Sequence, residues 1–500
     1  MKIKQFLEHH HIERNPFAEE DAQTDPVFKE LCIQVVYHPA WDKVYGDPSE
    51  PSTAVVFGEK GSGKTAMRLQ IANHAEEYNR THPDSKLYIL HYDDFNPFLD
   101  RFRQHVGPRK KADKVLAQWR LWDHMDAILS IGVTGLVDRV LGVKQPSKMV
   151  HGDVDTERLD QMDRHQKRDL LLLAAYYDQS VAQTSKMRWE RLRKRLNFGV
   201  WGTQVLPAVG FAWTVAIVTL LIAMAMNGMN AGMHSLWLYP LLVALGWIPW
   251  VVRFVQHWSL ASGVARHVRT GNHDVHALRK ILMNFTRSEL TAQPAPDKDR
   301  TDDRYELLAK FQGLLQELGY HGILVLIDRV DEPHLINGSA ELMKALVWPM
   351  LDNKFLKHPG LGLKLMLPIE LSRFVEREER EFYQRARLDK QNMIRSFQWT
   401  GEALYDVANA RMRACAEGGA KVDLSDMFDE KLTHRRLVDS LRSLRVPRHL
   451  FKFLYRLLVD HCNSHSEAEP QWRISGETFE SALAVYLRDQ DSFDRGVGAG

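Results

Sequence analysis

The chain has 500 residues, of which 44% are hydrophobic and 26% are charged, and its formal net charge at neutral pH is +2. This length provides for several domains, while the near-neutral charge excludes a bulk electrostatic attraction to nucleic acid. The three cysteines, Cys32, Cys415 and Cys462, lack the spacing of a disulfide framework or a metal site and suit a reducing compartment. The first residues lack the apolar core of a signal peptide, so we expect no secretion.

The first motif is the sequence GEKGSGKT, which fits the pattern of a phosphate-binding loop. An apolar run at 54–57 predicts a strand before it, and residues 66–72 predict a helix after it. Glycine allows backbone N–H groups to turn inward around phosphate oxygens, where side chains would clash. We expect Lys64 to reach the β- and γ-phosphates and the Thr65 hydroxyl to bind Mg²⁺. The predicted nucleotide-binding residues of this loop are Gly58, Glu59, Lys60, Gly61, Ser62, Gly63, Lys64 and Thr65.

Beyond this loop, residues 86–94 predict a second strand that ends in acidic residues, and residues 112–196 have a helical pattern. Residues 205–226 then form an apolar stretch long enough to cross a hydrocarbon core of about 30 Å as a helix. After a break at 227–234, residues 236–252 supply a shorter apolar run, so a transmembrane hairpin is predicted. The tryptophans near its expected interfaces are Trp201, Trp237, Trp247 and Trp250.

The orientation of this hairpin follows from the basic residues that flank it. The stretch between Arg195 and Arg253 carries no Lys, Arg, Asp or Glu, so the uncharged turn is the part that crosses the membrane. By the positive-inside rule both chain ends stay in the cytoplasm, which predicts a two-helix protein of the cytoplasmic membrane. Two alternatives stay open. One is a buried helical hairpin in a soluble protein, and the other is a re-entrant second run, which contains Pro240 and Pro249. The flanking cations are Lys186, Arg188, Arg191, Arg193, Lys194 and Arg195 before it, and Arg253, Arg266 and Arg269 after it.

The second half of the predicted site begins after a helix at 278–290, a linker at 291–300 and an amphipathic helix at 305–318. A short apolar run at 323–327 predicts a buried parallel strand, whose carboxyl end faces the ligand crevice of an α/β sheet. We expect Asp328 at this end to hold Mg²⁺, and Asp331 or Glu332 to deprotonate the attacking water. Alone, such a cluster is more often an acidic turn, but the upstream loop favours the site.

Two later positions are candidate sensors of the phosphate. Another strand at 360–367 is followed by Glu370 and Arg373, either of which would sense the γ-phosphate, although a plain turn is the more common meaning. Residues 400–487 have a helical pattern, and Pro447 places Arg448 in the first turn of a helix. Arg448 would reach the phosphates from a lid, although surface arginines usually contact only water.

These features predict an α/β fold in which a parallel sheet is flanked by helices, with a helical transmembrane insertion and a helical C-terminal lid. The predicted parts are an N-terminal segment at 1–47, the first half of the nucleotide domain at 48–110, a helical insertion at 111–200, the hairpin at 201–255, a helix and linker at 256–303, the second half at 304–399, the lid at 400–490 and a tail at 491–500.

The loop GEKGSGKT, the strand end IDRVDE and the later VPRHLFKFL together resemble the AAA+/STAND group of P-loop NTPases. The membrane hairpin between the loop and the acidic strand is similar to the KAP branch of that group. The resemblance implies that Lys64 and Thr65 bind phosphate and Mg²⁺, that Asp328 with Asp331 or Glu332 supports hydrolysis, and that Arg448 is a lid sensor. Arg329 departs from the pattern, since small or acidic residues are frequent there, and this leaves the base open.

The predicted function is a membrane-anchored, cytoplasm-facing ATPase that uses ATP and Mg²⁺ to switch conformation or oligomeric state at the bilayer. The resemblance suggests signalling or defence, a homo-oligomer and a protein partner of unknown identity. The predicted lipid contact lies at residues 205–252. The alternatives are a non-hydrolysing nucleotide-gated scaffold, a transporter component and a DNA-handling ATPase. The near-neutral charge and the lack of a nucleic-acid module argue against the last.

Overall fold

The computed structural model describes residues 1–143, 150–151, 154–180, 183–200, 205–226, 238–291 and 293–494. The chain forms two compact units: residues 1–89 together with 323–500 make unit 1, and residues 90–322 make unit 2. The division between the two units thus falls within the second strand, between residues 89 and 90. The inserted unit likewise ends at 322, within the strand that leads to Asp328.

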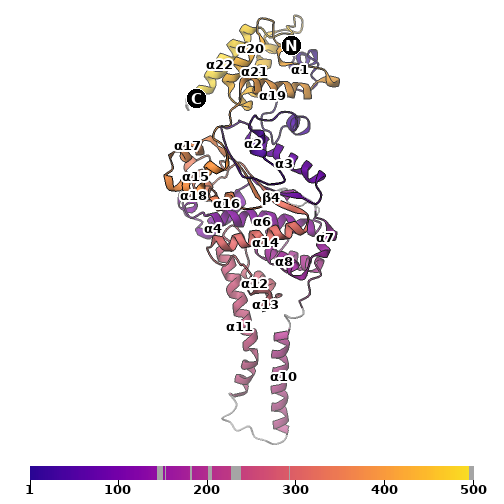
Figure 1. The fold of residues 1–500 in the computed structure, drawn as a ribbon, viewed down its shortest axis with the longest axis vertical. Helices are drawn as coiled ribbons and strands as arrows, with labels where there is room; N and C mark the ends of the chain where they lie inside the picture. Colours follow the sequence, from indigo (N-terminus) through magenta and orange to yellow (C-terminus); the bar gives the residue numbers. More distant parts are fainter. Residues whose placement is uncertain are drawn as a thin grey trace. The chain divides into compact units, whose positions relative to one another are not determined.

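A sheet with helices on its faces confirms the predicted α/β class (Figure 1). The described residues form six strands in the spatial order β3-β2-β4-β5-β1-β6. Strand β1 pairs in parallel with both β5 and β6, and β4 pairs in parallel with β5. Strand β5 thus separates β1 from β4. The strands are β1 (Ala54–Gly58), β2 (Lys86–Tyr92), β3 (Val150–His151), β4 (Tyr320–Ile327), β5 (Leu361–Pro368) and β6 (Asn392–Ile394).

The central strands are apolar runs buried on both faces, as expected for parallel strands covered by helices. Lys364 is the exception in β5. Its side chain is 1% exposed, and its ammonium donates a hydrogen bond to the carbonyl oxygen of Tyr45 at 2.9 Å. Burial lowers the pKa of Lys364 to about 7.

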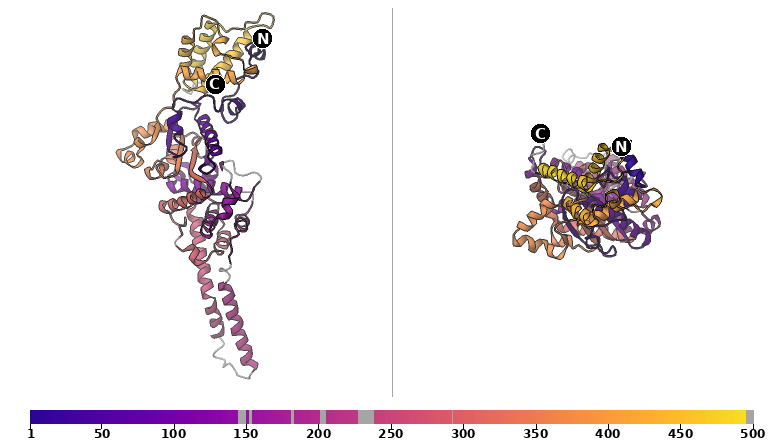
Figure 2. Two further views of the ribbon diagram at one scale, coloured as in Figure 1. Left: turned by 45° about the vertical axis from the view of Figure 1, so that its right-hand side comes forward. Right: turned by 90° about the horizontal axis from the view of Figure 1, so that it is seen from above.

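The helices of unit 1 surround this part of the sheet and also form a separate C-terminal cluster. The two ends of the chain share one core, since Phe6 and Phe17 pack with Leu450 and Leu454 (Figures 1 and 2). The unit 1 helices are α1 (Ile3–His9), α2 (Trp41–Tyr45), α3 (Lys64–Thr81), α15 (Ala340–Val347), α16 (Asn353–Leu356), α17 (Ile369–Arg377), α18 (Arg380–Ala386), α19 (Gly401–Ala414), α20 (His434–Leu441), α21 (Pro447–Ser464) and α22 (Gly476–Asp494), with a π-helical turn at Phe28–Cys32.

Unit 2 is mainly helical. The predicted single helix at 278–290 is two helices, because the chain breaks after Leu282 and restarts at Arg287 with Thr286 as its N-cap. The predicted helical insertion also contributes β3 to the sheet. The unit 2 helices are α4 (Asn96–Val106), α5 (Ala112–Leu116), α6 (Leu121–Val140), α7 (Thr156–Gln161), α8 (Arg164–Tyr177), α9 (Ser185–Arg195), α10 (Val205–Met226), α11 (Leu238–His267), α12 (Val275–Leu282), α13 (Arg287–Leu290) and α14 (Thr301–Glu317).

Helices α10 and α11 lie side by side, as both views show (Figures 1 and 2). The indole nitrogen of Trp213 donates a hydrogen bond to the carbonyl oxygen of Leu242 at 2.8 Å, and that of Trp247 donates to the Thr214 hydroxyl at 2.9 Å. A side chain at Gly246 would collide with the Trp213 ring. Reciprocal tryptophan contacts therefore hold the hairpin together.

By length and composition, one helix in the described part of the chain is able to cross a membrane, namely α10 over Pro207–Met224. A core helix of a soluble protein would bury its apolar side chains, whereas α10 exposes most of them. The second predicted run is continuous with α11, which contains Pro249 and extends to His267. Trp201, Trp237 and the break at 227–234 lie outside the described residues. The exposed apolar side chains of α10 are Val209, Phe211, Trp213, Val215, Val218, Leu220, Ile222 and Met226.

Several cations of the predicted flanks have structural roles in unit 2. The Arg188 guanidinium is buried between Asp138 at 2.9 Å and Asp178 at 2.8 Å. Arg253 donates to the carbonyl oxygens of Met283 and Phe285 at the end of α12. Arg188 thus connects α9 to α6 and to the end of α8, and Arg253 connects α11 to the segment after α12, so neither arginine acts only as an exposed topology signal.

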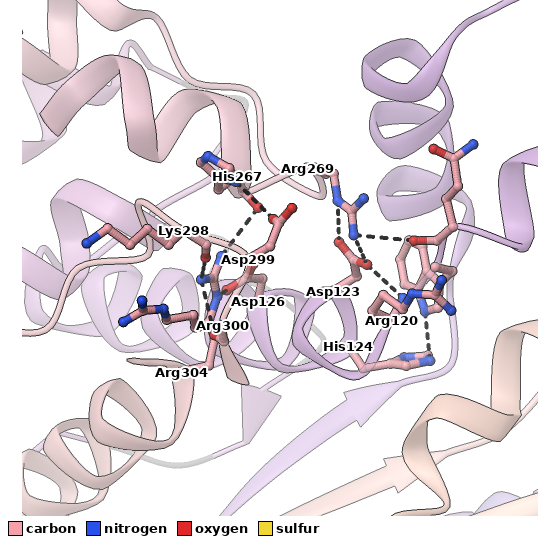
Figure 3. Close-up of polar contacts among 12 residues, drawn as sticks. Arg120, Asp123, His124, Asp126, His267, Arg269, Lys298, Asp299, Arg300 and Arg304 are labelled. Atoms are coloured by element: carbon pink, nitrogen blue, oxygen red, sulfur yellow. Dashed lines mark hydrogen bonds and ion pairs between the residues drawn. The ribbon is translucent and has the colours of Figure 1, made fainter. Parts of the chain in front are cut away.

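A buried charge cluster lies where α6 meets the end of α11 and the start of α14 (Figure 3). Asp123 and Asp126 are three residues apart on α6. Arg269 pairs with Asp123 at 2.6 Å, and Arg304 pairs with Asp126 at 3.2 Å. Arg304 also donates to the carbonyl oxygen of His267, the last residue of α11. The hairpin helix and α14 are thereby tied to the same helix of unit 2.

Candidate functional site

The loop between β1 and α3 forms a tight turn at the end of a central strand of unit 1. Gly61 and Gly63 have φ angles of +86° and +93°, a backbone conformation that favours glycine. The Lys64 ammonium folds back along the loop and donates hydrogen bonds to the carbonyl oxygens of Gly58 at 2.7 Å and Glu59 at 2.9 Å. The loop is therefore closed around a lysine at the first turn of a helix.

Asp328 follows β4 directly and meets the start of α3. The Thr65 hydroxyl donates a hydrogen bond to Asp328 Oδ2 at 2.8 Å, and Arg68 Nε lies 3.3 Å from the same oxygen. The backbone N–H of Arg329 donates to Asp328 Oδ1 at 2.9 Å. Asp328 is 2% exposed, so its carboxylate is held on both oxygens in a buried position. The two predicted halves of the site are thus in direct contact.

The charges of this region act on one another. Burial raises the pKa of Asp328, while Arg68, the Thr65 hydroxyl and Lys64 lower it. Burial lowers the pKa of Lys64, and Asp328, Asp331 and Glu370 oppose that shift. Lys64 therefore interacts with acidic residues from two segments of unit 1, the turn after β4 and the start of α17.

These side chains line one cavity of about 390 Å³. Arg373 is exposed on α17 and does not belong to the lining, whereas Glu370 does. Glu332 lines the cavity and pairs with Arg329, while Asp331 lines it and forms no ion pair among the described residues. The predicted residues that line the cavity are Lys60, Gly61, Gly63, Lys64, Thr65, Asp328, Asp331, Glu332, Glu370 and Arg448.

Arg448 lies against the tip of the loop. Its backbone N–H donates to the carbonyl oxygen of Gly61 at 3.3 Å, and a Cβ on Gly61 would lie 2.5 Å from the Cβ of Arg448. Pro447 begins α21, as predicted, which places Arg448 in the first turn. Its Nε atom is buried and has no hydrogen-bond partner within the described ranges. The structure therefore places this arginine at the cavity.

The lining of the cavity also contains a group of aromatic side chains. His38 stacks on Phe397 with ring centroids 3.6 Å apart, and Trp399 meets His38 edge-on at 4.9 Å. Burial lowers the pKa of His38 to about 4, so the ring is neutral at pH 7. The sequence prediction missed His38, Arg68, Phe397 and Trp399, because none belongs to a motif of fixed spacing.

The residues present fit a phosphate group and a divalent cation. A Cβ at Gly58 or Gly61 would lie 2.5 Å from a neighbouring side-chain atom, and both Ser62 Oγ and Arg448 Nε are buried donors without hydrogen-bond partners in the described part of the chain. The Thr65 hydroxyl and the Asp328 carboxylate supply oxygen atoms of the kind that Mg²⁺ prefers. No group of three or more His, Cys, Asp or Glu side chains among the described residues forms a metal cage. A cation here would need oxygen ligands from a bound phosphate.

Comparisons with protein families, with curated proteins and with solved structures find no match to this chain.

Proposed function

We propose that the protein is a membrane-anchored, Mg²⁺-dependent ATPase whose nucleotide site is the cavity of unit 1. The observation that carries this proposal is the 2.8 Å hydrogen bond from Thr65 to Asp328 beside Lys64. A hydroxyl at a helix start and a carboxylate at a strand end meet in this way where a nucleotide-bound Mg²⁺ is held. The position of β5 between β1 and β4 supports the predicted resemblance to the AAA+/STAND group.

Each residue has a chemical role in this proposal. The N-terminus of α3 and the Lys64 ammonium bind the phosphates. Thr65 and Asp328 would hold Mg²⁺, and the ion would supply positive charge to the phosphate oxygens. Asp331 or Glu332 accepts a proton from the water that attacks the γ-phosphorus, and the bond to the β–γ bridging oxygen breaks. Arg448 senses the phosphates from the C-terminal helices, which act as a lid.

The apolar part of the cavity lining supports a nucleotide with a flat base. Phe451 and Met343 add apolar surface to the cavity that Lys64 and Asp328 also line. A flat base is stabilised by such surface, while the phosphates need the charged residues. ATP therefore fits the lining of this site.

The anchor in this proposal is the hairpin of α10 and α11, inserted in the cytoplasmic membrane with both chain ends in the cytoplasm. The exposed apolar surface of α10 supports insertion. Flotation of the intact chain with phosphatidylcholine vesicles tests the anchor. A chain that stays at the bottom of the gradient would contradict it.

The hydrolysis of ATP is tested by phosphate release from the purified chain with Mg²⁺. We expect release from the wild type and its loss in Lys64→Ala and in a double Asp331→Ala, Glu332→Ala variant. Nucleotide binding without phosphate release by the wild type would favour the non-hydrolysing scaffold. Salt-dependent DNA binding would favour the DNA-handling alternative.

A further inference from the structure

A short segment between β6 and α19 lies against the phosphate loop. The backbone N–H of Phe397 donates to the carbonyl oxygen of Phe57, the residue before Gly58, at 2.8 Å. The indole N–H of Trp399 donates to the carbonyl oxygen of Ser62 at 2.7 Å. A Cβ placed on Gly63 would lie 3.6 Å from the Trp399 ring. The tryptophan therefore contacts the loop at the peptide that joins Ser62 to Gly63.

The hydrogen bond from Trp399 to the Ser62 carbonyl oxygen also fixes the orientation of the Gly63 N–H. A trans peptide is planar, and its carbonyl oxygen and its N–H point in opposite directions. Because the structure contains no cis peptide in its described residues, holding the Ser62 oxygen toward Trp399 turns the Gly63 N–H away from the tryptophan. Gly63 lines the cavity, and within the described ranges its N–H has no hydrogen-bond partner. This N–H is a free donor at the site proposed for phosphate.

The glycine on one side of this peptide gives the clamp a purpose. The orientation of the peptide between Ser62 and Gly63 depends on ψ of Ser62 and φ of Gly63, and Gly63 lacks the Cβ that limits backbone rotation, so the steric cost of turning this peptide over is reduced. Trp399 is itself well fixed. The residue after it, Thr400, caps α19 through a hydrogen bond from the N–H of Ala403, and His38 packs on the indole. A donor in a fixed position thus holds this peptide of the loop.

We propose that Trp399 is a positioning residue for phosphate binding: its indole N–H holds the Ser62–Gly63 peptide so that the Gly63 N–H faces the phosphates. This role rests on the proposed nucleotide site and deepens it. Trp399 touches the loop and acts through it. The same contact links the loop to the first residues of the C-terminal helices.

The test is a Trp399→Phe variant of the full chain, which keeps an aromatic ring and removes the donor. A lost hydrogen bond of this kind predicts about five- to tenfold weaker binding of both Mg·ATP and Mg·ADP. The KM for ATP should rise by a similar factor with little change in kcat, because a phosphate contact present before and during the reaction is lost. Trp472→Phe is the matched control, since Trp472 stacks on His9 at 4.3 Å and does not line the cavity.

A Trp399→His variant separates the donor from packing. It keeps a ring N–H, so we expect it to recover more nucleotide affinity than Trp399→Phe. Equal losses in the two variants would assign the effect to packing and overturn the role. Unchanged affinity in Trp399→Phe, with a wild type that binds nucleotide, would overturn this role alone. A wild type that binds no nucleotide would overturn the proposed function, and this role with it.

Discussion

The Thr65 hydroxyl donates a hydrogen bond to Asp328 at 2.8 Å, although the two residues are 263 positions apart in the sequence. The chain leaves unit 1 within β2, forms unit 2 with its apolar hairpin, and returns within β4. An insertion at this place does not disturb the sheet, because β2 and β4 are neighbours in it. Folding therefore brings two segments that are distant in the sequence together at one site.

The two candidate bases, Asp331 and Glu332, are expected to differ in their contribution to the hydrolysis rate. The Glu332 carboxylate pairs with Arg329, whereas Asp331 acts electrostatically on Lys64 within the cavity. We predict that Asp331→Asn reduces the hydrolysis rate by at least about a hundredfold, and that Glu332→Gln reduces it by less than about tenfold. Both variants should still bind Mg·ATP. Measurement of phosphate release at saturating ATP decides between them, and the reverse order would make Glu332 the base.

Gly61→Ala tests the contact between the loop and α21. Its Cβ would meet Arg448 at 2.5 Å, and its φ angle of +86° is strained for alanine. We predict at least tenfold weaker nucleotide binding, measured by equilibrium titration. Gly418→Ala is the control for backbone strain, because Gly418 also has a positive φ but has open space around it. We expect Gly418→Ala to lower the free energy of unfolding by about 1 kcal/mol and to leave nucleotide binding unchanged.

Lys364 should make the stability of unit 1 depend on pH. Its pKa is about 7 in the folded chain against 10.5 for a free lysine, so the unfolded state binds more protons between these values. The free energy of unfolding therefore rises as the pH increases from 7 to 10.5, by at most about 5 kcal/mol. Lys364→Met should remove this dependence.

The measurement for Lys364 is the midpoint of thermal unfolding at pH 6 and at pH 10. Relative to the wild type, the midpoint of thermal unfolding of Lys364→Met should shift upward by more at pH 6 than at pH 10. The lost hydrogen bond to the Tyr45 carbonyl lowers stability at both values and does not affect their difference. An equal effect at the two pH values would show that Lys364 is not desolvated.

Arg304 should be essential to the stability of unit 2. Removing this guanidinium leaves the Asp126 carboxylate buried, with the Tyr177 hydroxyl, which donates to it at 2.8 Å, as its remaining hydrogen-bond donor among the described residues. We predict a loss of about 3 to 5 kcal/mol for Arg304→Met. Arg287→Met, at an exposed position on α13, should have little effect on thermal unfolding. A wild-type melting temperature for Arg304→Met would contradict a structural role for this pair.

Motifs of fixed spacing and apolar runs predicted much of this structure. The runs at 54–57, 323–327 and 360–367 are the central strands, since buried parallel strands lack polar positions. Lys64, Thr65, Asp328 and Arg448 lie at one cavity because strand ends and helix starts meet at one edge of the sheet.

Other features depend on tertiary packing and leave no local pattern. Trp399 and His38 reach the loop from segments that are distant in sequence, and Arg68 pairs with Asp328 only after folding. Arg188 looks like a topology signal beside other cations, yet two buried aspartates from α6 and the end of α8 surround it. A lysine within the apolar run of β5 gave no sign of its burial, because its partner is a backbone carbonyl.

The central claim is that one nucleotide site is formed by the β1–α3 loop and Asp328. Titration of the full chain with a slowly hydrolysed ATP analogue and Mg²⁺, monitored by calorimetry, measures this most directly. We predict saturable binding at one site per chain, with affinity reduced at least about a hundredfold in Lys64→Ala and a lost Mg²⁺ dependence in Asp328→Asn. Wild-type affinity and wild-type Mg²⁺ dependence in both variants would contradict the account.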